Sequence, residues 1–166
     1  MAYILSGSET AAPELCIFCA RPAEGPAAYR KNLILCAAEH AFVIMNKYPY
    51  QNGHLMVIPR RHVADPADLA APEFAATSEL LRQATSALRA AMAPHGFNIG
   101  MNLGRVAGAG IDAHCHYHIV PRWNGDHNFM PVLAETRSIG EHLEATYEKL
   151  APHFALLGQG PVEGPT

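Results

Sequence analysis

Three histidines at every second position, His114, His116 and His118, are the most informative residues of the chain. In an extended strand the side chains alternate between two faces, so these three imidazoles are expected to share one face. A single histidine on an apolar face is usually a buried core residue, but three in a row have no use as core packing. An imidazole can bind a metal ion, or it can attack phosphorus as a neutral nucleophile and form a phosphoramidate.

The spacing limits the metal interpretation. A strand rises about 3.3 Å per residue, so the Cα atoms of His114 and His118 would lie about 13 Å apart. That is too far for three ring nitrogens to meet one zinc ion at about 2.1 Å unless the chain bends. Two neighbouring histidines could still share a metal ion. The alternative, attack on phosphorus, requires hydrogen-bond donors nearby for the phosphate oxygens.

A glycine-rich segment just before the histidines is a candidate source of these donors. Residues 104–110 read GRVAGAG, and glycine lets backbone N–H groups approach a phosphate without side-chain obstruction. A flexible turn is the alternative interpretation, since such loops are common. The segment is not a Walker loop, because Lys and Ser/Thr are missing at its end.

A second candidate site begins with the pair Cys16 and Cys19. Two cysteines separated by two residues offer thiolates at a spacing that suits zinc. In a reducing compartment such a pair more often binds a metal or does redox chemistry than forms a structural disulfide. A closed tetrahedral site needs two further ligands, and a pair of free or redox-active thiols is the alternative. Cys36 and Cys115 are expected to be ordinary small apolar residues.

The elements that must position these residues follow from apolar patterning. Runs bounded by turn residues predict strands at 33–37, 41–46, 54–59, 97–103 and 114–120, the last ending at Pro121. A long helix is predicted from Pro72 to Ala93, and a C-terminal helix around residues 139–150. Together they predict an α+β fold with one mainly antiparallel five-stranded sheet, one long helix and a C-terminal helix.

Size and composition predict a single domain. With 166 residues, 49% of them hydrophobic and 16% charged, we expect one folded domain over 13–157 with flexible tails at 1–12 and 158–166. No apolar run reaches the ~18 residues of a membrane span, and the start lacks a signal peptide, so we expect a cytoplasmic protein without membrane contact. The net charge of −3 argues against a nucleic acid polymer as partner, but it permits a small anionic ligand.

Several motifs together resemble the histidine triad (HIT) superfamily of nucleotide hydrolases and transferases. The three histidines are followed by Ile119 and Val120, and GHLMVIPRRH at 53–62 is similar to the family's Gly-His block. The runs NIGMNLGRVAG at 98–108 and PRWNGDHNFM at 121–130 resemble the branch that contains bacterial diadenosine tetraphosphate phosphorylases. The resemblance implies a HIT-like fold and a homodimer that joins two sheets edge to edge.

The resemblance also implies roles for individual residues. His116 would be the nucleophile that attacks the α-phosphorus, and His118 would donate to phosphate oxygens. His114 would orient His116, directly or through its backbone, and His54 would hold the phosphate or relay a proton. Nucleotide contacts are expected near the ribose and the phosphates, from Asn46, Asn102, Gly108, Gly110 and Arg122.

For the cysteine pair, the resemblance implies a structural zinc ion completed by His62 and His114, with no organic cofactor. The expected reaction converts diadenosine tetraphosphate and phosphate into ADP and ATP through a nucleotidyl-His116 intermediate. The alternatives are a general hydrolase of nucleoside phosphoramidates and dinucleotides, a non-enzymatic nucleotide-binding regulatory protein, and a mononuclear metalloenzyme.

Overall fold

The computed structural model describes residues 16–126 and 142–157. The expected tails at 1–12 and 158–166, and the beginning of the expected C-terminal helix, lie outside the described residues. No helix in the described ranges is both long enough and apolar enough to cross a membrane.

One antiparallel sheet organises the fold, with strand order β1-β2-β3-β5-β4. Its strands are β1 (Ile34–Ala37), β2 (Ala41–Met45), β3 (Leu55–Pro59), β4 (Gly96–Met101) and β5 (Tyr117–Arg122). The sequence therefore predicted all five strands, and the α+β fold with one five-stranded antiparallel sheet is confirmed.

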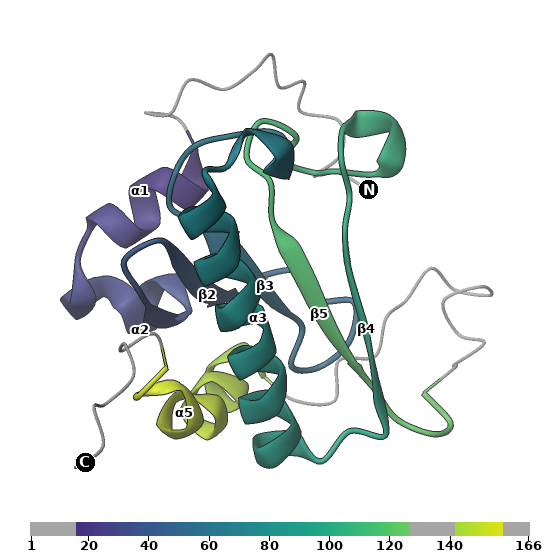
Figure 1. The fold of residues 1–166 in the computed structure, drawn as a ribbon. Coiled ribbons are helices and arrows are strands. Elements are labelled where there is room, and N and C mark those ends of the chain that lie inside the picture. Colours follow the sequence, from purple (N-terminus) through teal and green to yellow (C-terminus); the bar gives the residue numbers. More distant parts are fainter. Residues whose placement is uncertain (1–15, 127–141, 158–166) are drawn as a thin grey trace, which may run out of the picture.

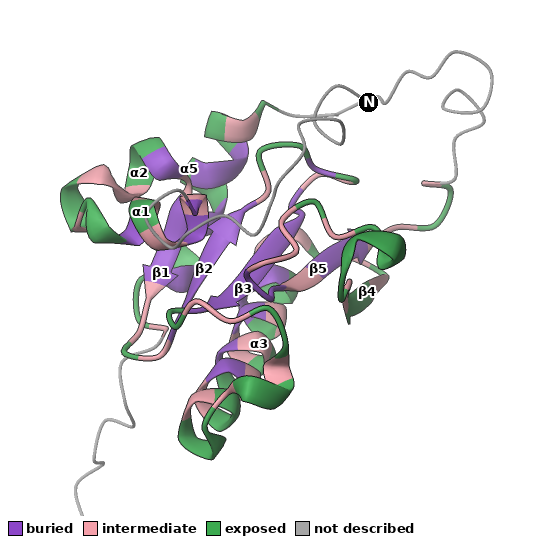
Figure 2. Ribbon diagram, turned by 90° about the horizontal axis from the view of Figure 1, so that it is seen from above, coloured by how far each residue is buried: buried purple, intermediate pink, exposed green. Residues whose placement is uncertain are grey.

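Helices cover the sheet on both faces. The long helix α3 (Ala71–Met92) crosses one face, and α5 (Leu143–Phe154) packs against it (Figure 1). Two short helices, α1 (Ile17–Ala23) and α2 (Tyr29–Asn32), lie on the side of the sheet away from α3 (Figure 2). The sequence did not predict these two helices.

The alternation of side chains along the central strands explains this layering. In β2, Val43 and Met45 pack toward α3 and α5, whereas Phe42 and Ile44 pack toward α1. All five residues of β2 and all five of β3 are buried, as the purple strands in Figure 2 show. A strand that is apolar on both faces needs cover on both, and the two layers of helices provide it.

The strand β5 differs from the expectation at both ends. It begins at Tyr117 rather than at His114. The residues before Tyr117 are bonded to the loop after β3 instead of to a neighbouring strand, since the Cys115 N–H donates to the Val63 carbonyl at 2.7 Å. At the other end the strand runs through Pro121 to Arg122. Pairing with β3 already ends at Ile119, so the N–H that proline lacks is not needed there.

Candidate functional site

The His116 ring has one nitrogen fixed by the backbone and the other available. Its Nδ1 lies 2.9 Å from the His114 carbonyl oxygen. A carbonyl only accepts, so Nδ1 carries the proton and Nε2 keeps its lone pair. Burial lowers the pKa of His116, so the ring is neutral near pH 7. A neutral imidazole with a free Nε2 is the form that can attack an electrophile.

Two further histidines adjoin this ring. The His118 ring centroid lies 4.9 Å from that of His116, and His118 Nδ1 lies 2.9 Å from Nε2 of His54. Burial, followed by the charge that His118 would carry, lowers the pKa of His54 to about 3. Burial and His116 lower the pKa of His118 to about 4. All three rings are therefore neutral at pH 7.

The structure brings Cys16, Cys19, His62 and His114 together as a second cluster, with one ligand atom of each within 4.8 Å of all the others. Cys16 Sγ lies 3.4 Å and Cys19 Sγ 3.6 Å from Nδ1 of His114, and Cys19 Sγ lies 3.3 Å from Nδ1 of His62. In a tetrahedral site with bonds of about 2.1–2.3 Å, ligand atoms lie about 3.4–3.8 Å apart. The four side chains could therefore hold a metal ion.

The proton on His114 favours the same conclusion. Its Nε2 lies 2.8 Å from the Pro59 carbonyl oxygen, so Nε2 carries the proton and Nδ1 offers a lone pair to the cluster. A carbonyl behind the ligating ring is the usual arrangement around a metal-bound histidine. Burial and the neighbouring Cys16 raise the pKa of Cys19 to about 11, so a cation is needed to keep the Cys19 thiol ionised at neutral pH.

The glycine loop follows β4 and holds a hydrogen bond between two of the expected nucleotide-binding residues. Asn102 donates from Nδ2 to the Gly108 carbonyl at 3.4 Å. Gly108 has φ +89°, which side chains rarely allow. Asn102 comes directly after Met101, which pairs with Tyr117 of β5, so this loop begins beside the histidine segment. Gly110 lies in the following bend.

The other two expected nucleotide-binding residues differ in position. Asn46 belongs to the histidine network, since its Nδ2 lies 3.3 Å from Nδ1 of His54. Arg122 lies four residues beyond His118, about 13 Å along the strand. Its guanidinium makes two hydrogen bonds to the Asp126 carboxylate, at 2.7 and 2.8 Å, so a phosphate contact there would have to replace an existing ion pair.

Two aromatic residues at the site were missed by sequence reasoning. Phe18 lies between the two cysteines of the pair, and its ring centroid is 5.0 Å from that of His116. Tyr50 stacks on His54 with centroids 4.8 Å apart, although 53% of it is exposed. Neither has a spacing signal, because each reaches the histidines only through the fold.

Comparison with known proteins identifies the family. The model of the HIT domain matches residues 29–125, and the chain belongs to this family. It is 37% identical over 125 residues to an AP-4-A phosphorylase of Mycobacterium tuberculosis, covering 75% of this chain and 64% of that protein. The chain thus spans less than two thirds of that relative. It is also 30% identical over 104 residues to an adenosine 5'-monophosphoramidase of Schizosaccharomyces pombe, covering 58% of this chain and 74% of that protein.

Solved structures agree with this assignment. A Zn-bound histidine triad family protein from Mycobacterium smegmatis matches with a TM-score of 0.67 and 25% identity, over 87% of this chain and 96% of that one. A HIT family member from Bacillus subtilis matches with a TM-score of 0.59 and 26% identity, over 66% of this chain and 74% of that one. The HIT fold expected from the sequence is therefore confirmed.

Proposed function

We propose that this protein transfers a nucleotidyl group from a dinucleoside polyphosphate to an acceptor, by way of a covalent bond to Nε2 of His116. The observation that carries the proposal is the neutral His116 ring, whose Nδ1 is bonded to the His114 carbonyl while Nε2 keeps its lone pair. The relative named AP-4-A phosphorylase supports diadenosine tetraphosphate as substrate and inorganic phosphate as acceptor.

The reaction takes two displacements at the same phosphorus. In the first, Nε2 of His116 attacks the α-phosphorus, the bond to the bridging oxygen breaks, and ATP leaves. His118 donates a hydrogen bond to a phosphate oxygen, and His54 supports His118. In the second, an oxygen of inorganic phosphate attacks, the P–N bond breaks, and ADP forms as His116 is restored. Water in place of phosphate would give AMP.

The glycine loop and Asn46 complete the proposed binding site. Asn102, Gly108 and Gly110 would contact the phosphates, and Asn46 lies where the resemblance puts a residue near the ribose. Arg122 is a candidate for the outer phosphates only if its bond to Asp126 opens.

The acceptor is tested by product analysis. With diadenosine tetraphosphate and labelled inorganic phosphate, we expect label in ADP, unlabelled ATP, and a rate that rises with phosphate concentration. If no label enters ADP and the rate ignores phosphate, phosphorolysis is excluded. AMP and ATP as the products would then favour a hydrolase, the activity class that the monophosphoramidase relative suggests.

We also propose that the metal ion of the cysteine-histidine cluster is zinc and that its role is structural. Two thiolates and two imidazoles are a donor set that zinc prefers. The Zn-bound relative from Mycobacterium smegmatis supports this choice. Bound to these side chains, the ion would supply a cross-link between α1, the segment after β3 and the residue that orients His116.

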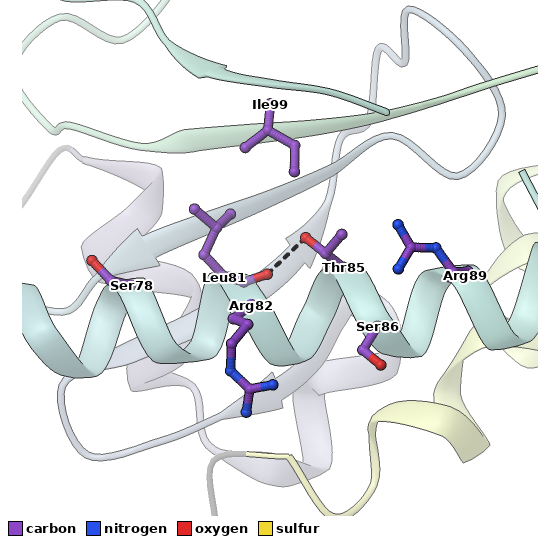
Figure 3. A pocket seen from close by; sticks show the side chains of 7 residues that line it. All are labelled: Ser78, Leu81, Arg82, Thr85, Ser86, Arg89 and Ile99. Atoms are coloured by element: carbon purple, nitrogen blue, oxygen red, sulfur yellow. Dashed lines mark hydrogen bonds between the residues drawn. The ribbon is translucent and has the colours of Figure 1, made fainter. Parts of the chain in front are cut away.

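Finally, we propose a homodimer joined along β4. This strand lies at the edge of the sheet, and Ile99 on it is 47% exposed. Beside it, a groove of about 440 Å³ runs along α3, where Leu81 and Ile99 point toward each other (Figure 3). The residues that line this groove are Ser78, Leu81, Arg82, Thr85, Ser86, Arg89 and Ile99.

A second copy could pair with the backbone of this edge strand and cover Ile99. Sedimentation equilibrium should then give about twice the 17.9 kDa of one chain, and Ile99→Lys should shift the protein toward monomer. A monomer at every concentration tested would contradict the proposal.

A further inference from the structure

We infer that the turn between β2 and β3 determines which nitrogen of His118 carries its proton, through Asn46 and the backbone N–H of Tyr50. Toward His118 these groups act as positioning residues, because they influence its proton only through His54. This role is separate from the contact near the ribose proposed for Asn46. The inference rests on the proposed function, since it explains how a neutral His118 can donate to a phosphate.

The first step concerns the orientation of the Asn46 side chain. Its Oδ1 lies 2.9 Å from the backbone nitrogen of Tyr48, which can only donate. The amide oxygen therefore faces Tyr48, and the NH₂ group faces His54, 3.3 Å from its Nδ1. An amide NH₂ group also can only donate, so Nδ1 of His54 must accept.

A second donor independently requires the same proton position. The backbone N–H of Tyr50 points at Nδ1 of His54 over 3.1 Å. Since both Asn46 and Tyr50 donate to this nitrogen, it holds a lone pair. A neutral imidazole has one N–H, so the proton of His54 lies on Nε2.

The third step concerns which nitrogen of His118 is protonated. Nε2 of His54 donates to Nδ1 of His118 across 2.9 Å, so the proton of His118 lies on its Nε2. The Nε2–H of His118 is therefore available to donate to a substrate while the ring remains neutral. With pKa values of about 3 and 4, His54 and His118 keep these tautomers throughout the neutral range.

The two adjacent rings thus end with opposite roles. The His114 carbonyl accepts from His116 and leaves Nε2 of that ring as a nucleophile. His54 donates to His118 and leaves Nε2 of that ring as a donor. The difference follows from what each ring contacts. His116 contacts a carbonyl, which accepts, whereas His118 contacts His54, which donates because Asn46 and Tyr50 donate to it in turn.

The variant Asn46→Asp tests this assignment, because it keeps the shape of the side chain and replaces the donor by a carboxylate oxygen. The new carboxylate favours a proton on Nδ1 of His54 and raises the pKa of His54 from about 3. Below the raised pKa, His54 carries both protons and still donates to His118. Above it, neutral His54 keeps its proton on Nδ1, so His118 must donate from Nδ1 and loses the N–H on Nε2.

We therefore expect kcat of Asn46→Asp to fall as the pH rises through the raised pKa of His54. The expected loss at pH 8 is about 10- to 100-fold, at or below the usual effect of removing one hydrogen-bond donor to a transition state. The wild type should show no such decrease. The matched control is Gln51→Glu, which makes the same amide-to-carboxylate change in the same turn and should keep the wild-type pH profile. Asn46→Ala retains the Tyr50 N–H and should lose less kcat than Asn46→Asp.

¹⁵N NMR of the imidazoles reads the tautomers directly and needs no substrate, so failure of the inference and failure of the proposed function are distinguishable. Wild-type His54 and His118 should both be protonated on Nε2 alone, and Asn46→Asp should move the proton of His54 to Nδ1 at pH 8. A wild-type His118 protonated on Nδ1 would overturn the inference. Unchanged tautomers in Asn46→Asp would also overturn it. So would a raised KM in Asn46→Ala together with near-wild-type activity in Asn46→Asp, because this pair of results indicates that Asn46 contacts only the ribose.

Discussion

His116→Asn should reduce kcat by several orders of magnitude and leave the fold intact. The change removes the nucleophilic Nε2, and loss of a covalent nucleophile has effects of this size. The shorter amide side chain can still donate to the His114 carbonyl, so the local backbone keeps its hydrogen bond. The measurement is steady-state turnover of diadenosine tetraphosphate, together with thermal melting.

The control for this variant is His153→Asn, the same substitution on an exposed residue of α5. It should turn over substrate at the wild-type rate. A kcat for His116→Asn within tenfold of wild type, measured on protein free of wild-type contamination, would refute the covalent mechanism.

Loss of the proposed zinc site should give the largest change in stability. If metal binds the folded protein alone, a thousandfold excess of free metal over Kd stabilises it by about 4 kcal/mol. For a chain of this size that corresponds to about 8–16 °C in Tm. Cys16→Ser should therefore melt lower by about this amount and contain no zinc, whereas the wild type should hold about one zinc ion per chain by elemental analysis.

Cys36→Ser separates this effect from the burial of a hydroxyl group. Cys36 is buried like Cys16, with 7% of it exposed against 3%, and burial raises the pKa of its thiol to about 12. It lies outside the cluster. It should lose some stability and keep its zinc. Wild-type protein that contains no metal after purification without chelators, or Cys16→Ser that retains a full equivalent, would contradict the proposed site.

The sequence predicted the sheet and the long helices because their signals are local. Five apolar runs bounded by turn residues correspond to β1–β5, and the stretch rich in helix formers after Pro72 corresponds to α3. The short helix α1 has no such signal, since its seven residues contain Pro22 and too few turns for a period to be visible. It is held by tertiary contacts of Cys16 and Phe18 with the sheet.

The start of β5 shows the limit of pattern reading. Alternating residues 114–118 are typical of a strand. In the structure, however, the His114 ring is hydrogen-bonded to the Pro59 carbonyl and the Cys115 N–H to the Val63 carbonyl. Both contacts come from a distant segment, so periodicity within the strand could not predict them. The result is a histidine whose ring joins the cysteine cluster while its carbonyl orients His116.

The chemistry of the site was predictable in residue type and not in proton position. Three alternating histidines predicted either a metal site or attack on phosphorus, and the resemblance added His54 and His62. The proton positions depend on which neighbour accepts or donates, and those neighbours include the carbonyl of His114 and the amide of Tyr50. Backbone groups carry no sequence signal, so only the folded chain reveals them.

The stereochemistry at phosphorus tests whether the nucleotidyl group passes through a covalent bond to His116. The substrate is diadenosine tetraphosphate with one sulfur of defined configuration on the α-phosphorus, and the acceptor is inorganic phosphate. Each in-line displacement inverts the configuration, so two displacements through His116 predict an adenosine thiodiphosphate with the configuration of the substrate retained. An inverted product would mean a single direct attack by phosphate and would exclude the covalent intermediate on His116.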